Sequence, residues 1–209
     1  MRDKLKRIVG GDKLILLAAT AVVFALFTVL NPNFLSWMNF VNILVASSLV
    51  GLVAIGHTYL IIAGQNDLSP GSLAAFSGVL AALLVSSGVN LYLSFVMTLM
   101  AGALVGVFNA FMVNRIKLEA FIATLVTQSI VRGFAYILCN GKPVAIADKT
   151  FIQLGKARFL DIPVAVWIMV IAFIIFGFIL AKTRFGRSLY AIGGNKDAAR
   201  LAGLNPQRI

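Results

Sequence analysis

Long apolar stretches separated by short polar ones constrain this 209-residue chain more than any other feature. A helix needs about 20 mostly apolar residues to cross about 30 Å of hydrocarbon. Six stretches approach that length: Leu14–Leu30, Asn39–Ala63, Gly71–Ser87, Leu91–Val113, Ala120–Leu138 and Pro163–Ala181. None alternates apolar and polar residues as a barrel strand would, so each is expected to be a helix. The sequence therefore predicts an all-α, polytopic transmembrane helical bundle of about six spans, with residues 1–209 forming a single domain.

The composition excludes several classes of protein. Hydrophobic residues make up 60% of the chain and charged residues 12%, whereas a soluble domain has about 45–50% and about 25%. So few polar side chains cannot cover a water-facing surface, which excludes a soluble enzyme and a disordered chain. The net charge of +11 does not indicate a nucleic-acid partner, because the basic residues stand in short runs between apolar stretches. The single Cys139 and single His57 exclude a disulfide framework and a metal site built from cysteines or histidines.

The basic residues predict how the bundle is oriented in the lipid bilayer. If residues 1–13 are cytoplasmic, thirteen of the 18 Lys and Arg residues fall on the cytoplasmic side, mostly in residues 1–13 and 182–209. Four others lie in the long outer loop at about residues 139–162, and Arg132 lies within a span. Cytoplasmic loops carry an excess of Lys and Arg, so we expect a cytoplasmic N-terminus, a periplasmic loop at 139–162 and a cytoplasmic segment at 182–209.

Small residues recur at every fourth position in two of the spans. Gly102, Gly106 and Ala110 do so in the fourth span, and Ala74 and Gly78 in the third. This spacing allows helix backbones to approach closely in lipid, and it predicts a compact bundle.

Polar residues interrupt the apolar pattern at residues 65–71, between the second and third spans. Asp67 is the only acidic residue within residues 13–118, and Ser69 followed by Pro70 fits a helix N-cap with proline at the first helical position. Two interpretations stay open. The segment is either a cytoplasmic turn whose polar residues only cap the next helix, which its position slightly favours, or a break that lines a water-filled pathway.

The fifth span carries polar side chains, including Thr124, Thr127 and Arg132. A charge inside the bilayer is costly, so it usually faces the bundle interior or extends to an interface. Arg132 lies near the outer end of its span, which makes extension to the interface an alternative. We favour a polar helix face along a pathway, and this makes Asp67, Ser69, Thr124, Thr127 and Arg132 the candidate pathway residues.

The chain becomes polar after residue 181. Gly193–Gly194 is expected to break the chain there. Asn195 can cap a short helix, Asp197 suits the positive end of that helix, and Gly203 can close it, which predicts a helix over Lys196–Ala202. Two turns are too short to be stable alone in water, so this helix is expected to rest on something else, either anionic lipid or a cytoplasmic protein.

Three motifs resemble one known family. Residues 183–204 closely resemble a signature of the membrane subunits of ABC sugar importers of the ribose, xylose, galactose and arabinose type. Asp67-Leu-Ser-Pro-Gly-Ser72 is similar to that family's Asp-Leu-Ser-x-Gly-Ser motif. Ala120-Phe-Ile-Ala-Thr-Leu125, followed by Arg132-Gly133, is similar to its Pro-Phe-Ile-x-Thr-Leu…Arg-Gly stretch. The order and spacing also match from about residue 40, so the chain is identified as a member of this permease family.

The resemblance implies a permease subunit that carries a monosaccharide across the bacterial cytoplasmic membrane. A second permease copy, identical or different, would complete the pathway. Two ABC ATPase subunits would bind ATP beneath the pair, and a periplasmic or lipid-anchored sugar-binding protein would deliver the sugar. The permease itself would hold no catalytic residue and no cofactor. Such permeases continue with several more spans, so this chain is expected to be a partial one.

The same resemblance implies that the helix over Lys196–Ala202 is the coupling helix, which would seat in a groove of the ATPase. The implied ATPase-coupling residues are Gly193, Gly194, Asn195, Ala198, Ala199, Arg200 and Gly203.

Other functions remain as alternatives. A transporter driven by protons or sodium would need carboxylates within the membrane, for which Asp67 and Glu119 are the only candidates. An enzyme embedded in the membrane would need a cluster of His, Asp or Glu residues in the spans, and none is present. The third alternative is a permease fragment without transport activity of its own.

Overall fold

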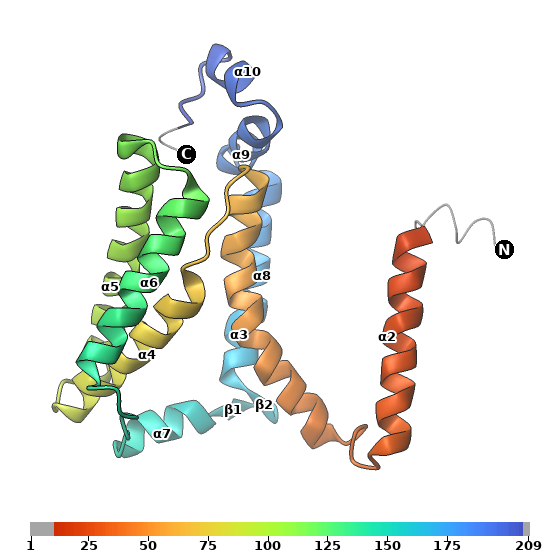
Figure 1. Ribbon diagram of the computed structural model, residues 1–209. Coiled ribbons are helices and arrows are strands. Elements are labelled where there is room, and N and C mark those ends of the chain that lie inside the picture. Colours follow the sequence, from red (N-terminus) through yellow and green to blue (C-terminus); the bar gives the residue numbers. More distant parts are fainter. Residues whose placement is uncertain (1–10, 207–209) are drawn as a thin grey trace. The chain divides into compact units, whose positions relative to one another are not determined.

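The computed structural model describes residues 11–206, with side chains from residue 14 onward. These residues are mostly helical, as predicted (Figure 1). The elements are α2 (Gly11–Leu30), α3 (Trp37–Ile62), α4 (Pro70–Ser86), α5 (Leu91–Phe111), the π-helical turn η1 (Met112–Ile116), α6 (Ala120–Leu138), α7 (Lys149–Lys156), β1 (Arg158–Phe159), β2 (Ile162–Pro163), α8 (Val164–Lys182), α9 (Arg184–Gly194) and α10 (Lys196–Leu201). The predicted cytoplasmic N-terminus, residues 1–13, lies largely outside the described residues.

Each of the six predicted spans corresponds to a helix. Within the part of the chain that the structure describes, four helices are long and apolar enough to cross a membrane: α3, α5 continued by η1, α6 and α8. The apolar helices at Leu14–Leu30 and Pro70–Ser86 are shorter. With 17 residues at about 1.5 Å each, α4 is only about 25 Å long, less than the roughly 30 Å of a hydrocarbon core.

The described chain divides into two compact units, one up to Ser47 and one from Ser48 onward. In the first unit, α2 leads through a short turn into the first part of α3. The ring of Phe34 lies 4.9 Å from that of Phe24 and 5.6 Å from that of Phe27, measured between centroids. Asn39 Nδ2 donates to the carbonyl oxygen of Phe34 at 2.7 Å. These contacts fasten the turn to the two helices that it joins.

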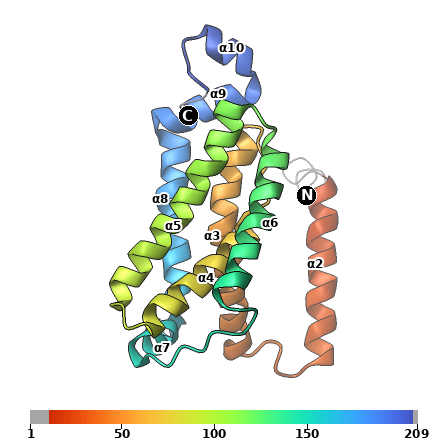
Figure 2. The same cartoon turned by 60° about the vertical axis from the view of Figure 1, so that its left-hand side comes forward.

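In the second unit, α4 packs against both α5 and α6 (Figure 2). Its buried residues include Ala81, Ala82 and Val85, and those of α6 include Ala123 and Ala135. Alanine side chains on both helices let the backbones lie close together, which replaces the missing hydrophobic drive for association in lipid.

The close contacts occur at other glycines than the sequence suggested. A Cβ atom added at Gly78, Gly102 or Gly106 would meet nothing within 4 Å, so these motifs do not bring helices together within the described residues. A Cβ at Gly51 would instead lie 2.5 Å from Sδ of Met169 in α8. The small-residue spacing indicates where a backbone could be approached, but only the packing decides which of those faces is used.

The later part of α3 lies beside α8, and Tyr59 fastens the two helices (Figure 1). Its hydroxyl donates to the carbonyl oxygen of Phe176 at 2.5 Å. Its ring also stacks on that of Phe185 in α9, with 6.0 Å between centroids. Tyr59 therefore connects α3, α8 and α9.

The predicted outer loop, residues 139–162, contains structure that the sequence analysis did not anticipate. Helix α7 begins where Asp148 Oδ1 accepts a hydrogen bond from the backbone N–H of Phe151 at 2.7 Å. The ring of Phe151 stacks on Phe95 of α5 with 6.0 Å between centroids. Strands β1 and β2 then pair antiparallel around Leu160 and Asp161, whose φ values are +53° and +60°. Two positive φ values are typical of a two-residue hairpin turn.

Candidate functional site

An irregular segment separates α3 from α4, the second and third predicted spans. Helix α3 ends at Ile62, and Gly64, two residues later, has a φ of +73° that suits glycine; Gln65 N donates to the carbonyl oxygen of Leu60 at 2.8 Å. Residues 65–69 have no regular secondary structure and run alongside α6 before α4 begins at Pro70 (Figure 1). The segment therefore enters the helix bundle instead of forming a short turn at its end.

Asp67 holds the start of α4. Its Oδ1 atom accepts two hydrogen bonds from Ser69, one from the backbone N–H and one from the hydroxyl, each at 2.7 Å. Ser69 occupies the N-cap position of α4 with Pro70 at the start of the helix, as expected, but Ser69 has helical backbone angles and its side chain makes no cap hydrogen bond. Instead, the side-chain oxygen of Asp67 accepts the hydrogen bonds of Ser69, two residues further along the chain, and so fixes the residue that precedes α4.

A chain of polar side chains continues from Asp67 into the core of α4, α5 and α6. Asn109 Nδ2 donates to Ser69 Oγ at 3.4 Å, and Thr127 Oγ1 donates to Asn109 Oδ1 at 2.6 Å. Ser69, Asn109 and Thr127 are 2%, 8% and 2% exposed. We call Asp67, Ser69, Asn109 and Thr127 the polar ladder. Because each member has a partner, the ladder avoids the cost of unpaired polar groups in an apolar core.

Thr124 fastens the irregular segment to α6. The backbone N–H of Leu68 donates to Thr124 Oγ1 at 3.2 Å, and this hydroxyl donates in turn to the carbonyl oxygen of Ala120 at 2.8 Å. Thr124 is 4% exposed. The structure thus brings together Asp67, Ser69, Thr124 and Thr127.

Arg132 is not part of this group. It follows Thr127 by five residues, which turns its side chain about 140° away around the helix. The Arg132 side chain is exposed. The fifth candidate pathway residue therefore lies on another face of α6.

After the C-terminal end of α8, the chain forms a helical hairpin of α9 and α10. Gly193 and Gly194 were expected to break the chain, but both are helical residues of α9. The break falls at Asn195, which is extended with φ −158° and ψ 107°. A Cβ at Gly193 would overlap the carbonyl oxygen of Ile62, so glycine is needed there because α9 touches the end of α3.

Helix α10 begins and ends as the sequence predicts. Asn195 Oδ1 accepts hydrogen bonds from the backbone N–H groups of Asp197 and Ala198 at 3.0 and 2.9 Å. Gly203 has a φ of +86°, and its N–H donates to the carbonyl oxygen of Arg200 at 3.0 Å. Both caps satisfy backbone groups that a free helix end would leave unpaired.

The apolar residues of α10 point in two directions. Ala199 is 4% exposed, and α10 packs against α9. Leu201 is 90% exposed. The α9–α10 hairpin thus buries one small residue internally and presents one large apolar residue outward.

Comparison with known proteins identifies the family. Residues 39–209 match the family model described as "Branched-chain amino acid transport system / permease component", and this region runs from α3 through α10.

The chain belongs to this permease family.

Three curated relatives illustrate the similarity. The L-arabinose transport system permease protein of Escherichia coli (strain K12) is 40% identical over 193 residues, 92% of this chain and 59% of the relative. The ribose import permease protein of Haemophilus influenzae is 37% identical over 91% of this chain and 60% of the relative. The ribose import permease protein of Bacillus subtilis is 37% identical over 90% of this chain and 59% of the relative. The chain thus spans about three fifths of the length of these relatives. No solved structure matches it.

Of the permease residues implied in coupling, only Ala199 is buried, but several of the exposed ones also have a structural role. Gly193 touches α3, Asn195 caps α10 and Ala199 is buried. Ala198 and Arg200 are exposed, as is Leu201, which the sequence analysis did not include among the coupling residues. An outer surface of α10 can therefore be defined by Ala198, Arg200 and Leu201.

Sequence analysis missed Asn109 of the permease, and it quoted Ser72 only within a family motif, not as a candidate pathway residue. Asn109 joins Ser69 to Thr127, and its signal was available: an amide side chain in an otherwise apolar span. Ser72 is 1% exposed, and its Oγ has no hydrogen-bond partner within the described residues. Serine is common in apolar helices, so Ser72 was recognised only as the last residue of the Asp67–Ser72 motif and its burial was not expected.

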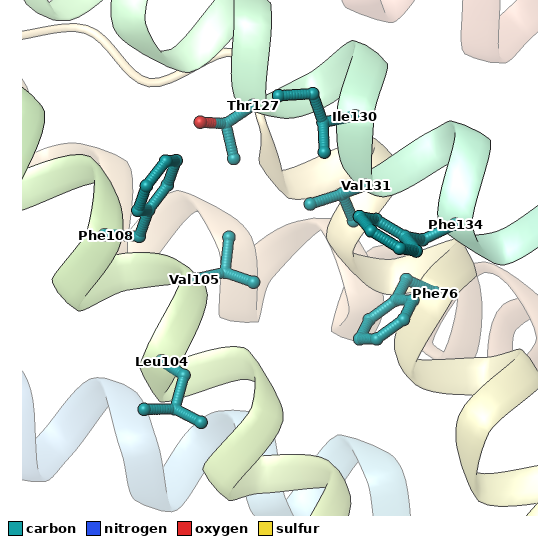
Figure 3. Close-up of a pocket in the computed structure, with 8 residues that line it drawn as sticks. All are labelled: Phe76, Leu104, Val105, Phe108, Thr127, Ile130, Val131 and Phe134. Atoms are coloured by element: carbon teal, nitrogen blue, oxygen red, sulfur yellow. The ribbon is translucent and has the colours of Figure 1, made fainter.

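The permease also has an apolar pocket of about 320 Å³ between α4, α5 and α6 (Figure 3). Phe76 and Phe134 lie at one end of it, and Phe108 lies near Thr127 at the other. Thr127 is the only polar residue among the eight that line it. A ligand rich in hydroxyl groups would lose its hydrogen bonds to water there, so this pocket does not suit a sugar.

Proposed function

We propose that this permease is the membrane-spanning part of an ATP-driven importer that carries a monosaccharide across the bacterial cytoplasmic membrane. The named functions of the curated relatives, import of L-arabinose and ribose, support this substrate class. The exposed Leu201 on a helix that is capped at both ends carries the proposal, because it is the feature that a separate motor protein could bind.

In this proposal the permease has several partners. An ABC ATPase binds the outer surface of α10, a periplasmic or lipid-anchored binding protein delivers the sugar, and a second permease copy completes the pathway. The permease carries out no chemical reaction and needs no cofactor of its own, since ATP is bound by the ATPase. Its N-terminus and the segment at 182–209 are cytoplasmic.

The ATPase would act by binding two states of the permease with different affinity. A movement of the ATPase would displace α10 first and then α9. Helix α9 is attached to α3 at Gly193 and Ile62 and again through Tyr59 and Phe185. Any displacement of α9 is therefore passed to the end of α3, from which residues 65–69 lead to the polar ladder.

We also propose that Asp67, Ser69, Thr124 and Thr127 lie beside the pathway, whereas Arg132, on another face of α6, would reach it only where a second permease copy covers that face. The irregular segment supports this role, because non-helical backbone at membrane depth is usually found next to a cavity or within protein. Asp67→Asn keeps an oxygen that can accept both hydrogen bonds from Ser69, so it separates the charge from the cap.

Uptake of labelled sugar tests the role of Asp67. We expect Asp67→Asn and Asp67→Ser to reduce sugar uptake although the protein is expressed at its normal level. The reason is that both substitutions remove the negative charge of Asp67 from the segment. Normal uptake by both variants would mean that Asp67 only caps α4.

Uptake also tests the function as a whole. Cells that express the full gene product with its ATPase and binding protein should accumulate L-arabinose or D-ribose only when the ATPase hydrolyses ATP. Uptake that persists with an inactive ATPase and stops when the proton or sodium gradient is removed would establish the ion-coupled alternative.

A further inference from the structure

A second, polar pocket lies at the end of the bundle that carries α9 and α10. Its volume is about 380 Å³, within the range of small-molecule sites. Three parts of the chain line it: the segment after α3, the turn between η1 and α6, and Lys196 at the start of α10.

Five polar side chains meet in this pocket: Gln65, Asn66, Lys117, Glu119 and Lys196. Within residues 14–206, none of these side chains forms a hydrogen bond or an ion pair with another residue. The two amides both donate and accept, the lysines donate and the carboxylate accepts. Such a set can pair with hydroxyl groups, each of which donates one hydrogen bond and accepts others.

The N-terminus of α6 adds further donors to the pocket. Glu119 is the N-cap residue, but its side chain makes no cap hydrogen bond. The first backbone N–H groups of a helix have no partner inside the helix, and Ala120 and Phe121 line the pocket. The ring of Phe121 is 49% exposed and offers an apolar face to the C–H side of a sugar ring.

The pocket contains charges of both signs. Two lysines and the N-terminus of α6 would attract a phosphate group, but the Glu119 carboxylate in the same pocket weakens that attraction. A sugar hydroxyl can use the carboxylate as an acceptor and the lysines as donors.

We propose that this pocket is a low-affinity monosaccharide site at the cytoplasmic mouth of the pathway. The proposal rests on the proposed import function. Gln65 and Asn66 lead directly to Asp67 of the polar ladder, and Lys196 is the first residue of α10. Because one wall belongs to α10, a movement of α10 changes the site, and occupancy of the site is linked reciprocally to the position of α10.

Saturation-transfer NMR on the purified full chain in nanodiscs, without the binding protein, tests the site. L-Arabinose and D-ribose are the probes. We expect a sugar signal from the wild type. Gln65→Ala removes one hydrogen bond and Glu119→Gln removes the charge of one acceptor, so each should weaken the affinity by about fivefold or more. Gln128→Ala in α6 and Asp161→Asn in the hairpin are matched controls outside the pocket and should leave the signal unchanged.

Several results would overturn the site. These are no sugar signal from the wild type, equal signals from pocket and control variants, or binding of inorganic phosphate in place of sugar.

Alkylation provides a second measurement if a pocket variant does not fold. In a Cys139→Ser background, sugar should slow the reaction of Asn66→Cys with a maleimide but not that of Ser129→Cys. Equal rates with and without sugar would contradict the proposal. If the complete importer takes up sugar while both measurements fail, only this site is wrong. If ATP-driven uptake itself is absent, the proposed function is wrong.

Discussion

Single residues in this permease are explained by the atoms that lie next to them. Gly193 and Gly194 are neighbours in α9, yet a Cβ at Gly193 would overlap the carbonyl oxygen of Ile62, while one at Gly194 would meet nothing within 4 Å. The backbone of α9 can approach α3 only because Gly193 has no side chain. The adjacent glycine has no such constraint.

This difference predicts opposite results for two otherwise identical substitutions. Gly193→Ala forces α9 away from α3, so it should lower the free energy of unfolding by about 1–3 kcal/mol and reduce sugar uptake. Gly194→Ala should leave both near the wild-type values. Thermal unfolding of the purified protein and uptake in cells measure the two effects, and similar losses for both variants would contradict the proposed contact.

The polar ladder makes a second prediction for single residues. Thr127→Val removes the hydrogen that Thr127 Oγ1 donates to Asn109 Oδ1, which leaves a buried acceptor unpaired. The free energy of unfolding should fall by about 1–3 kcal/mol. Ser129→Ala is the control, because this exposed hydroxyl bonds only to the carbonyl oxygen of Leu125 in its own helix. Denaturant unfolding should separate the two variants; equal stability would argue against the ladder.

At the scale of whole elements, α10 shows how a helix of six residues is held in place. Its caps come from Asn195 and Gly203, and its inner side, at Ala199, is covered by α9. A charge at Ala199 would therefore separate α10 from α9, and a side chain at Gly203 would strain its positive φ. Neither substitution isolates the contact with a partner, whereas a substitution at Leu201 does.

Leu201→Asp should abolish association with the ATPase and leave the permease folded. The reason is that Leu201 is 90% exposed, so the fold loses no contact. Leu160→Asp is the control, since Leu160 is 71% exposed in the β1–β2 turn at the other end of the second unit (Figure 1). Co-purification with the ATPase and the thermal midpoint are the measurements. Retained association by Leu201→Asp, or equal loss with the control, would remove α10 as the docking element.

At the scale of the whole molecule, the single cysteine allows a direct test of orientation. Cys139 is partly buried at the end of α6, and the distribution of Lys and Arg residues predicts that this end lies on the outer side of the membrane. A membrane-impermeant maleimide applied to cells with a permeabilised outer membrane should label Cys139. It should not label Leu201→Cys in a Cys139→Ser background until the inner membrane is opened. The reverse pattern would invert the proposed topology and exclude docking of a cytoplasmic ATPase at α10.

The sequence by itself determined the helices and the ends of α10, because these features depend on neighbours only a few residues apart. Apolar runs of sufficient length predicted α3, α5, α6 and α8, and Asn195 with Gly203 predicted the caps. The motifs also identified the permease family, which the match over residues 39–209 confirms.

Only the tertiary structure decided how these helices use their polar residues and glycines. Ser69 meets Asn109 across 40 positions of sequence, and Asn109 meets Thr127 across 18. Gly193 owes its role to Ile62, which lies on a different helix. Contacts of this kind depend on which faces the helices turn toward one another, and in lipid that choice is made by close packing and hydrogen bonds between helices, which no local pattern records.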